Sequence, residues 1–225
     1  MEFTDLMAER WSCRAFRPEP VEEEVLRGIF ATAQQTASWC NTQPWGVHLL
    51  SGDTAQWFGK ELSEHVVANA SPEQQSPDLD LPAAYTGVYQ QRRREAGYAL
   101  YESLGIERSD LGRRAEQMLL NYTFFGAPHV AVVTSDRSQG TYGAVDCGGY
   151  VANLMNAALD VGVASIAQGA IGMYAGAVRE LLGLDDDRVV VCGVSLGRPD
   201  EEHPVNAFRT SRAALDELVT VVERP

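Results

Sequence analysis

Short runs of β-branched residues are scattered among longer stretches with helical periodicity, and this alternation constrains the fold more than any other feature. The predicted strands cover residues 45–50, 129–134, 163–167 and 189–196. The predicted helices cover residues 21–33, 53–68, 85–104, 111–125, 142–161 and 175–182. Because helices outnumber these short, scattered strands, we expect an α+β fold in which helices flank a mixed central sheet.

The ends of some elements are marked by particular residues. Asp53 or Thr54 could cap the second helix, and Gly183 is expected to end the helix that begins at Ala175. Three prolines with Ser, Asp and Gln fill residues 71–82, which predicts a loop. With 225 residues the chain fits one domain, 1–225, and we expect a lid or loop at about 71–105. The tail from Ser211 to Val222 is amphipathic.

Charge and cysteine usage exclude several classes of protein. A net charge of −13 argues against nucleic acid or an anionic membrane surface as a partner, because both attract basic surfaces. The four cysteines have neither CxxC nor metal-finger spacing, and the four histidines are dispersed, so no metal site is expected. No signal-peptide or membrane-span pattern is found, which predicts a cytoplasmic protein.

The segment from Arg10 to Phe16 alternates polar and apolar side chains. In extended backbone this period places Arg10, Ser12 and Arg14 on one face. Arginine forks bind phosphate oxygens in pairs, and a serine hydroxyl adds a neutral donor. The segment is therefore typical of a phosphate site, although two solvated arginines on a surface segment would give the same spacing.

A second polar segment follows one helix later. Ser38, Asn41 and Gln43 lie between two tryptophans, Trp39 and Trp45. Amide side chains both donate and accept hydrogen bonds, which matches the edge of a flat, polar heterocycle. A polar turn before a strand is the alternative.

These two segments, in this order, resemble the start of the FMN-dependent nitroreductase superfamily. The resemblance continues almost to the end of the chain and indicates a subgroup with a longer central helical segment. The further matching residues are Tyr89–Arg94, Leu100–Tyr101, Gly105–Ile106, Asn121–Pro128, Asn153–Met155, Gly162, Gln168, Val191–Gly197 and Arg209–Arg212.

The resemblance implies an intertwined homodimer with flavin at the interface. Arg10, Ser12 and Arg14 would hold the FMN phosphate and ribityl chain, with Arg212 and Arg209 joining from the C-terminal side. The side chains of Ser38, Asn41 and Gln43 would reach the flavin from the partner subunit. Residues Gln168, Gly169 and Ala170 would run beside the ring, where small residues allow close backbone approach.

The implied activity is hydride transfer from NADPH or NADH, through flavin N5, to a nitroaromatic or quinone acceptor. No catalytic side chain is expected, because the flavin supplies the chemistry. Trp39, Phe124 and Phe125 could form apolar walls for the substrate, and Arg92 could meet an anionic group; core packing and a solvated helix face are the alternatives. A flavin-dependent oxidase or dehydrogenase of a small metabolite and a non-catalytic flavin-binding protein stay open. The G-x-S-x-G pattern around Ser195 does not indicate a hydrolase, because Pro199 prevents the required turn into a helix.

Overall fold

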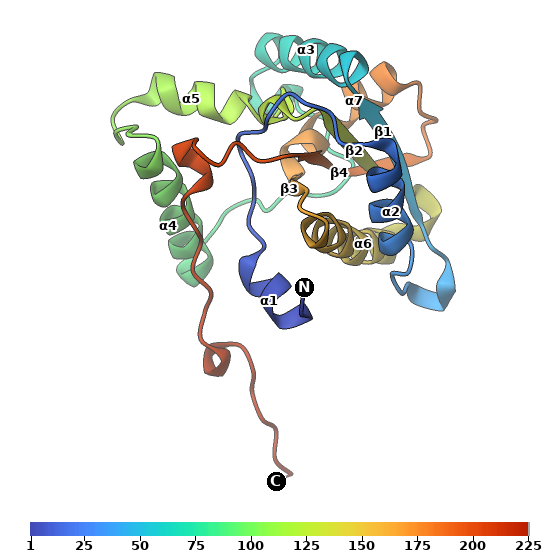
Figure 1. The fold of residues 1–225 in the computed structure, drawn as a ribbon, viewed down its shortest axis with the longest axis vertical. Helices are drawn as coiled ribbons and strands as arrows, with labels where there is room; N and C mark the ends of the chain where they lie inside the picture. The colour runs from blue at the N-terminus through green and yellow to red at the C-terminus, as the bar shows by residue number, and fades with distance from the viewer. Residues whose placement is uncertain (225) are drawn as a thin grey trace.

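Four strands form one sheet at the centre of the molecule (Figure 1). The computed structural model describes residues 1–224; Pro225, the last residue of the expected domain, lies outside the described residues. The strands are β1 (Trp45–Ser51), β2 (His129–Asp136), β3 (Ala164–Gln168) and β4 (Arg188–Gly197). Their order is β1-β2-β4-β3. Each lies within two residues of its predicted position at either end.

The α+β class is confirmed, but the strand pairs are not mixed. All three pairs among the described residues are antiparallel. The strands β2 and β3 run in the same direction and are joined through a helix, an arrangement that favours parallel pairing. The strand β4 lies between them and runs opposite to both, so a parallel neighbour never forms.

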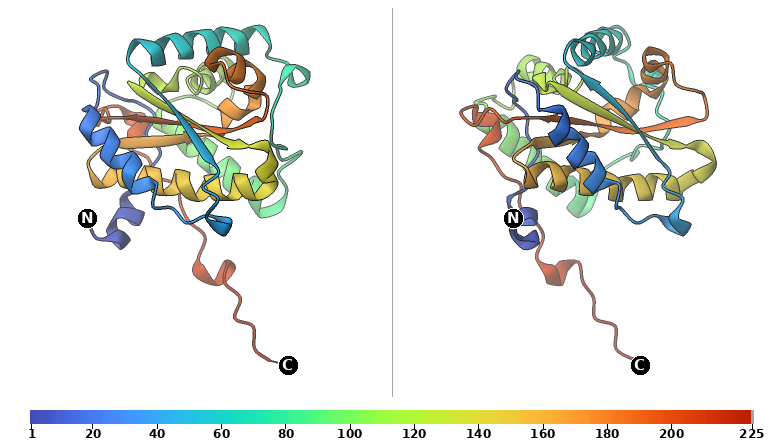
Figure 2. Two further views of the ribbon diagram at one scale, coloured as in Figure 1. Left: turned by 90° about the vertical axis from the view of Figure 1, so that its right-hand side faces the viewer. Right: turned by 45° about the vertical axis from the view of Figure 1, so that its right-hand side comes forward.

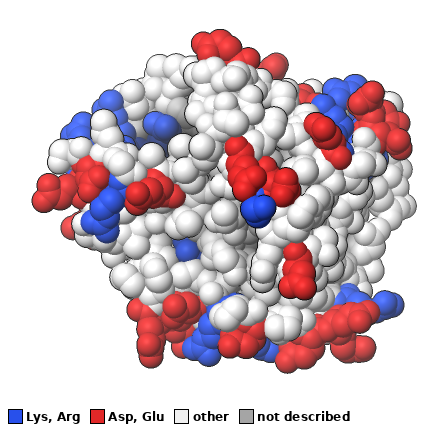
Figure 3. Space-filling view, turned by 90° about the horizontal axis from the view of Figure 1, so that it is seen from above, with Lys and Arg blue, Asp and Glu red and all other residues white. Residues whose placement is uncertain are grey.

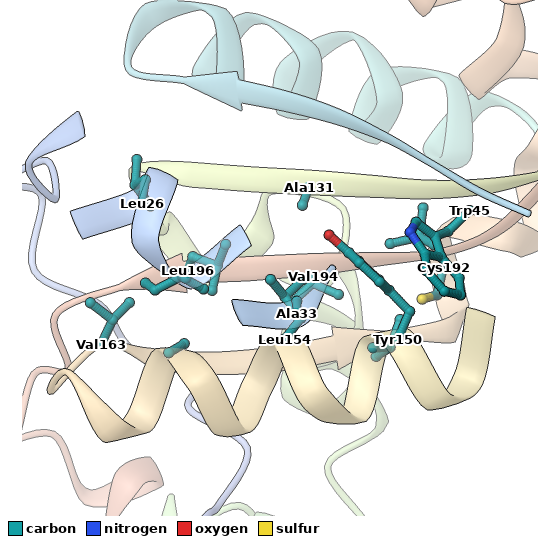
Figure 4. Packing of buried hydrophobic residues seen from close by; sticks show 14 of the residues in the cluster. Leu26, Ala33, Trp45, Ala131, Tyr150, Leu154, Val163, Cys192, Val194 and Leu196 are labelled. Atoms are coloured by element: carbon teal, nitrogen blue, oxygen red, sulfur yellow. The ribbon is translucent and has the colours of Figure 1, made fainter. Parts of the chain in front are cut away.

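Helices cover both faces of the sheet, as Figure 2 shows from the side. On one face lie α2 (Glu23–Ala33) and α6 (Gly140–Asp160), and on the other lie α3 (Asp53–Ala68) and α7 (Ala175–Leu182). Figure 4 shows the first of these cores, in which Leu154 and Tyr150 of α6 pack beneath Ala131, Val194 and Leu196.

The strand β2 serves both cores because its side chains alternate. Val130 and Val132 pack toward α3 and α7, whereas Ala131 and Val133 pack toward α2 and α6. In β4 the pairing shifts opposite Val133, where one extra residue, Val191, enters the strand. As a result Val190 joins the α3 core while Cys192 joins the α6 core, which an unbroken period of two would forbid.

Three helices lie outside these layers. They are α1 (Phe3–Glu9), α4 (Gly87–Ser103) and α5 (Leu111–Leu119). Leu6 is the only buried residue among them. The tail beyond residue 207 passes between α1 and α4 and extends away from the molecule (Figure 1). Seven short 3-10 helices connect the elements: 39–41, 72–74, 124–126, 137–139, 169–174, 204–206 and 215–217.

Two predicted helix ends are wrong. The helix α5 ends at Leu119 instead of Phe125, because Phe124 and Phe125 take φ angles of 59° and 55° that a right-handed helix cannot contain. The residue before α3 is Gly52, at φ 54°, and no side chain caps that helix. Asp53 therefore begins α3 and does not cap it.

Candidate active site

Two segments from opposite ends of the sequence line one cavity of about 630 Å³. The first segment follows α1, and the second belongs to the C-terminal tail. The backbone N–H of Cys13 donates to the carbonyl of Ser165 at 3.0 Å, which fixes the first segment beside β3. The expected site residues that line the cavity are Arg10, Ser12, Arg14, Arg209 and Arg212. We call this set the arginine bowl.

The arginine bowl concentrates positive charge within an acidic chain. None of the ion pairs among residues 1–224 includes one of its four guanidinium groups. Burial and the nearby charge of Arg212 lower the pKa of Arg10, and burial lowers the pKa of Arg14. Like charges held this close repel one another, and an anion with several oxygens relieves that repulsion. By contrast, acidic and basic side chains are interspersed on the face drawn in Figure 3.

Aromatic rings link the two segments of the bowl reciprocally. The guanidinium carbon of Arg14 lies 5.6 Å from the ring centroid of Phe208, and that of Arg209 lies 4.7 Å from the ring of Trp11. Each segment therefore supplies one cation and one ring to the other. Such contacts contribute about 0.5–1 kcal/mol each at exposed sites.

Asn206 is a residue of this site that the sequence pattern did not reveal. Its buried side chain accepts a hydrogen bond from the backbone N–H of Arg14 at 2.9 Å, and its amide nitrogen donates to the carbonyl of Ala15 at 2.8 Å. The backbone carbonyl of Asn206 accepts a hydrogen bond from Nη1 of Arg209 at 2.8 Å. A single asparagine within His203–Ala207 carries no motif, so only the fold could show this role.

The second predicted segment forms a preorganised, outward-facing loop, residues 38–43, which we call the polar loop. Cys40, Asn41 and Gln43 all have left-handed φ angles, of 48°, 56° and 48°. The backbone N–H of Gln43 donates to Oγ of Ser38 at 2.9 Å, and Nε2 of Gln43 donates to the carbonyl of Asn41 at 3.2 Å. Such backbone strain is typical of functional loops that the surrounding structure holds in place.

The polar loop and the arginine bowl lie toward opposite ends of α6. The backbone N–H of Trp39 donates to Asp146 at 3.1 Å. The helix α1, which leads into the bowl, instead contacts Asn156 of α6 through Met7, and the amino group of Met1 before it pairs with Asp160. Ten residues of helix separate Asp146 from Asn156, or about 15 Å. One chain therefore does not bring the two predicted signatures together.

Residues 168–170 differ in their exposure to solvent. The Gln168 side chain is buried: Oε1 accepts from the hydroxyl of Ser195, and Nε2 donates to the carbonyl of Asn121 at 2.6 Å. Gly169 is exposed, and no heavy atom lies within 4 Å of the position that a Cβ would take. Ala170 is half-buried. The backbone at Gly169 is thus open to a flat ligand, while the Gln168 amide is occupied within the fold.

A second cavity, of about 660 Å³, lies on the other side of the tail, against α4. Arg209 and Arg212 line it as well, and Arg92 of α4 faces them across it. Arg92 forms an ion pair with Glu217 of the tail at 3.3 Å. Arg92 therefore shares a cavity with two arginines of the bowl, but its charge is paired with Glu217, and Glu95 also lines the cavity.

The three expected aromatic wall residues differ in exposure. Trp39 is 54% exposed and meets Tyr142 edge-on, with the ring centroids 3.9 Å apart. Phe124 is 1% exposed and stacks on Phe58 at 5.5 Å, so it packs in the α3 core and lines neither the cavity of the bowl nor the cavity against α4. Phe125 is also buried, at 7% exposed. The sequence placed both phenylalanines in a helix, and the left-handed turn instead directs them inward.

Other candidate sites have structural explanations. Ser195 is fully buried within β4, as expected, and follows no strand-to-helix turn. Within residues 1–224, no group of three or more His, Cys, Asp and Glu side chains could hold a metal ion. No helix in the described part of the chain combines the length and apolar character needed to cross a bilayer.

Comparison with known proteins agrees with this geometry. Residues 7–198 match the Nitroreductase family. The chain is 35% identical to nitroreductase NfnB of Mycolicibacterium smegmatis, covering 94% of this chain and 89% of that protein. It is 32% identical to a 4-nitrobenzoate reductase of Pseudomonas putida, covering 94% and 91%.

A solved structure extends this agreement to the whole fold. The crystal structure of the FMN- and NADPH-dependent nitroreductase NfnB from Sphigopyxis sp. strain HMH superposes with a TM-score of 0.94. The two chains are 34% identical, and the superposition covers 100% of each. This chain therefore belongs to the nitroreductase family.

Proposed function

We propose that this protein is an FMN-dependent oxidoreductase that transfers a hydride from NAD(P)H to a nitroaromatic or quinone acceptor. The observation that carries the proposal is the arginine bowl, in which four guanidinium groups and a serine line one cavity. Glu9 lines the same cavity, but among residues 1–224 no carboxylate forms an ion pair with any of the four guanidinium groups. The relatives add the reaction class, since NfnB from Sphigopyxis is FMN- and NADPH-dependent.

The residues present fit the FMN phosphate. Arg10, Ser12 and Arg14 would hold it from one side, and Arg209 and Arg212 from the tail. Nη1 of Arg212 already donates to Oγ1 of Thr210 at 2.9 Å, and Nη1 of Arg14 donates to the carbonyl of Ser12 at 3.2 Å. Each guanidinium has further N–H groups for phosphate oxygens. The open backbone at Gly169 would lie beside the ring.

A second copy of the chain would complete the site. The polar loop contacts α6 at Asp146, about 15 Å along the helix from Asn156, which contacts α1 beside the bowl. Ser38, Asn41 and Gln43 would therefore act on the flavin of a partner. Exposed apolar side chains adjoin the polar loop, with Trp39 54%, Tyr142 55% and Val145 59% exposed. Neighbouring exposed apolar side chains are typical of protein interfaces, and a homodimer would bury them here.

The cofactor would carry out the electron transfer, and the protein would bind and orient the cofactor. Bound FMN supplies a two-electron carrier that takes a hydride from NAD(P)H and passes electrons to the acceptor. The chain's own residues would hold the phosphate, orient the ring through backbone at Gly169, and exclude water through the partner's polar loop. We assign no acid or base.

The neighbouring surface would select the acceptor. Arg92 would attract an anionic group such as a carboxylate, and the Pseudomonas putida relative is a 4-nitrobenzoate reductase. The loop after α3 and α4 itself, residues 71–105, would form a lid, since α4 has no buried residue. We also propose a cytoplasmic location, because all four cysteines are free.

Flavin bleaching tests this function. The purified protein should carry a visible flavin spectrum that NADPH or NADH bleaches, and a nitroaromatic or quinone should restore it. A colourless protein that cannot be reconstituted with FMN would refute the proposal. Bleaching by neither nucleotide would favour an oxidase or dehydrogenase, and bleaching without reoxidation by any acceptor would favour a flavin-binding protein without turnover.

A further inference from the structure

Asn206 joins the two segments of the arginine bowl, which lie about 190 residues apart in the sequence. It is 6% exposed and sits in the 3-10 helix 204–206, just before the tail. Its Oδ1 accepts from the backbone N–H of Arg14, and its Nδ2 donates to the carbonyls of Ala15 and Asp200, both at 2.8 Å. The Asn206 side chain thus fixes the backbone at Arg14 and Ala15.

The same residue also fixes the other segment. The backbone carbonyl of Asn206 accepts a hydrogen bond from Nη1 of Arg209 at 2.8 Å. One residue therefore sets the position of a guanidinium on each side of the cavity. Only a short primary amide offers one acceptor and two donors at this distance, whereas aspartate lacks the donors.

We propose that Asn206 is a positioning residue that sets the geometry of the arginine bowl and thereby its preference for a phosphorylated flavin over riboflavin. This inference rests on the proposed function. Guanidinium groups that repel one another spread apart unless the backbone beneath them is fixed. Phosphate binding by paired N–H groups is sensitive to such displacement, because sites lose their effect when a supporting shell is loosened by about 1 Å.

The test compares flavins that differ only in the phosphate. The full-length chain, stripped of flavin, is titrated with FMN and with riboflavin, and quenching of flavin fluorescence gives the two Kd values. In Asn206→Ala the FMN affinity should fall about tenfold or more, as expected for a lost buried hydrogen-bond network, while riboflavin affinity changes much less. Asn206→Ser, which keeps one hydroxyl, should be intermediate and covers the case in which the alanine variant does not fold.

Asn69→Ala is the matched control. Asn69 also holds a turn of the chain, because its side-chain Nδ2 donates to the backbone carbonyl of His65 at 2.8 Å. Its backbone carbonyl accepts a hydrogen bond from the hydroxyl of Tyr174. Asn69 does not line the bowl. Its loss should lower thermal stability and leave the ratio of the two Kd values unchanged.

The outcomes separate the inference from the proposed function. If the Asn206 variants that fold keep the wild-type ratio of the riboflavin Kd to the FMN Kd, the proposed role of Asn206 is wrong and the proposed phosphate site is unaffected. A wild-type protein without any preference for FMN would overturn both. Selective loss of FMN binding supports the inference, since a purely structural defect would weaken both flavins together.

Discussion

The arginine bowl and the polar loop are the two polar regions that we propose for flavin binding, but the chain builds them differently. The bowl is assembled from segments that meet only in the folded state, through Asn206 and two reciprocal cation–π contacts. The polar loop is fixed mainly by its own hydrogen bonds and by left-handed backbone at three residues. The proposed phosphate site therefore lies within one chain, whereas we propose that the outward-facing polar loop acts on the flavin of a second copy.

Loss of a bowl arginine should have the largest effect. In Arg14→Ala, FMN affinity should fall about 100-fold, since several charge-assisted hydrogen bonds disappear together. Riboflavin affinity should change little, because riboflavin has no phosphate. Asn41→Ala in the polar loop should instead weaken both flavins to a similar degree. Isothermal titration of each variant measures the contrast.

Arg137→Ala is the control for the loss of positive charge. Arg137 pairs with Asp78 at 3.2 Å and does not line the bowl. If it lowers FMN affinity as much as Arg14→Ala does, the local geometry of the bowl is unimportant and the comparison fails.

Mixed dimers should show whether the two regions act in one shared site. If each flavin site takes its bowl from one subunit and its polar loop from the other, Arg14→Ala and Asn41→Ala homodimers would both be impaired at every site. A heterodimer of the two would contain one intact site. Co-expression should therefore restore roughly a quarter of the wild-type activity, given random pairing of subunits. Activity no higher than the mean of the two variants would place both regions of a site in the same chain.

Arg92 should have a smaller effect that depends on the acceptor. In Arg92→Ala the KM for a carboxylated nitroaromatic should rise about fivefold, as expected for one partly exposed ion pair, while the KM for a neutral one stays nearly constant. Arg93→Ala is the matched control, because Arg93 lies on the same helix but packs over Tyr85 and does not line the cavity. Equal changes for both acceptors would remove Arg92 from substrate recognition and confine anion binding to the bowl.

Sequence reasoning recovered what depends on local pattern. The four strands follow from β-branched runs. The alternation at Arg10, Ser12 and Arg14 predicts that these side chains share one face, and all three line one cavity; their binding of phosphate stays a prediction. The helix α1 was missed because seven residues are too few to show a helical period. Asn206 was missed because its role consists of hydrogen bonds to residues nearly 200 positions away.

The errors arose where tertiary packing overrides local preference. Phe124 and Phe125 adopt left-handed backbone that the sequence alone disfavours, and burial of both rings offsets the strain. The extra residue at Val191 changes which of the two cores the β4 side chains enter, which no alternation pattern could reveal. That the polar loop serves a second subunit is an expectation from the family resemblance alone, because the spacing of its residues carries no information about another chain.

The smallest expected effect is the pH dependence of stability, and it should act on the segment around Val21, which follows the bowl in the sequence. His129 is buried, its Nε2 accepts from the backbone N–H of Val21, and its Nδ1 faces Oγ of Ser51 at 2.7 Å. Burial lowers the pKa of His129 below its ordinary 6.5. The folded state therefore binds this proton less readily than the unfolded state, so stability is full above about pH 6.5 and declines as the pH falls toward the folded-state pKa.

A variant separates this titration from general acid effects. His129→Phe removes the titrating group and leaves the Val21 N–H without its acceptor, which should cost about 1–3 kcal/mol at neutral pH. Its unfolding free energy should then fall less steeply than that of the wild type between about pH 6.5 and 5. The protection of the Val21 amide from hydrogen exchange, relative to its intrinsic exchange rate at each pH, should fall with acid in the wild type. The protection of the polar-loop amides should not respond in this way, because none of the hydrogen bonds of the loop involves a histidine. If the unfolding free energies of the two proteins fall in parallel with pH, His129 does not cause the acid sensitivity. The segment that follows the bowl would then be no more pH-dependent than the polar loop.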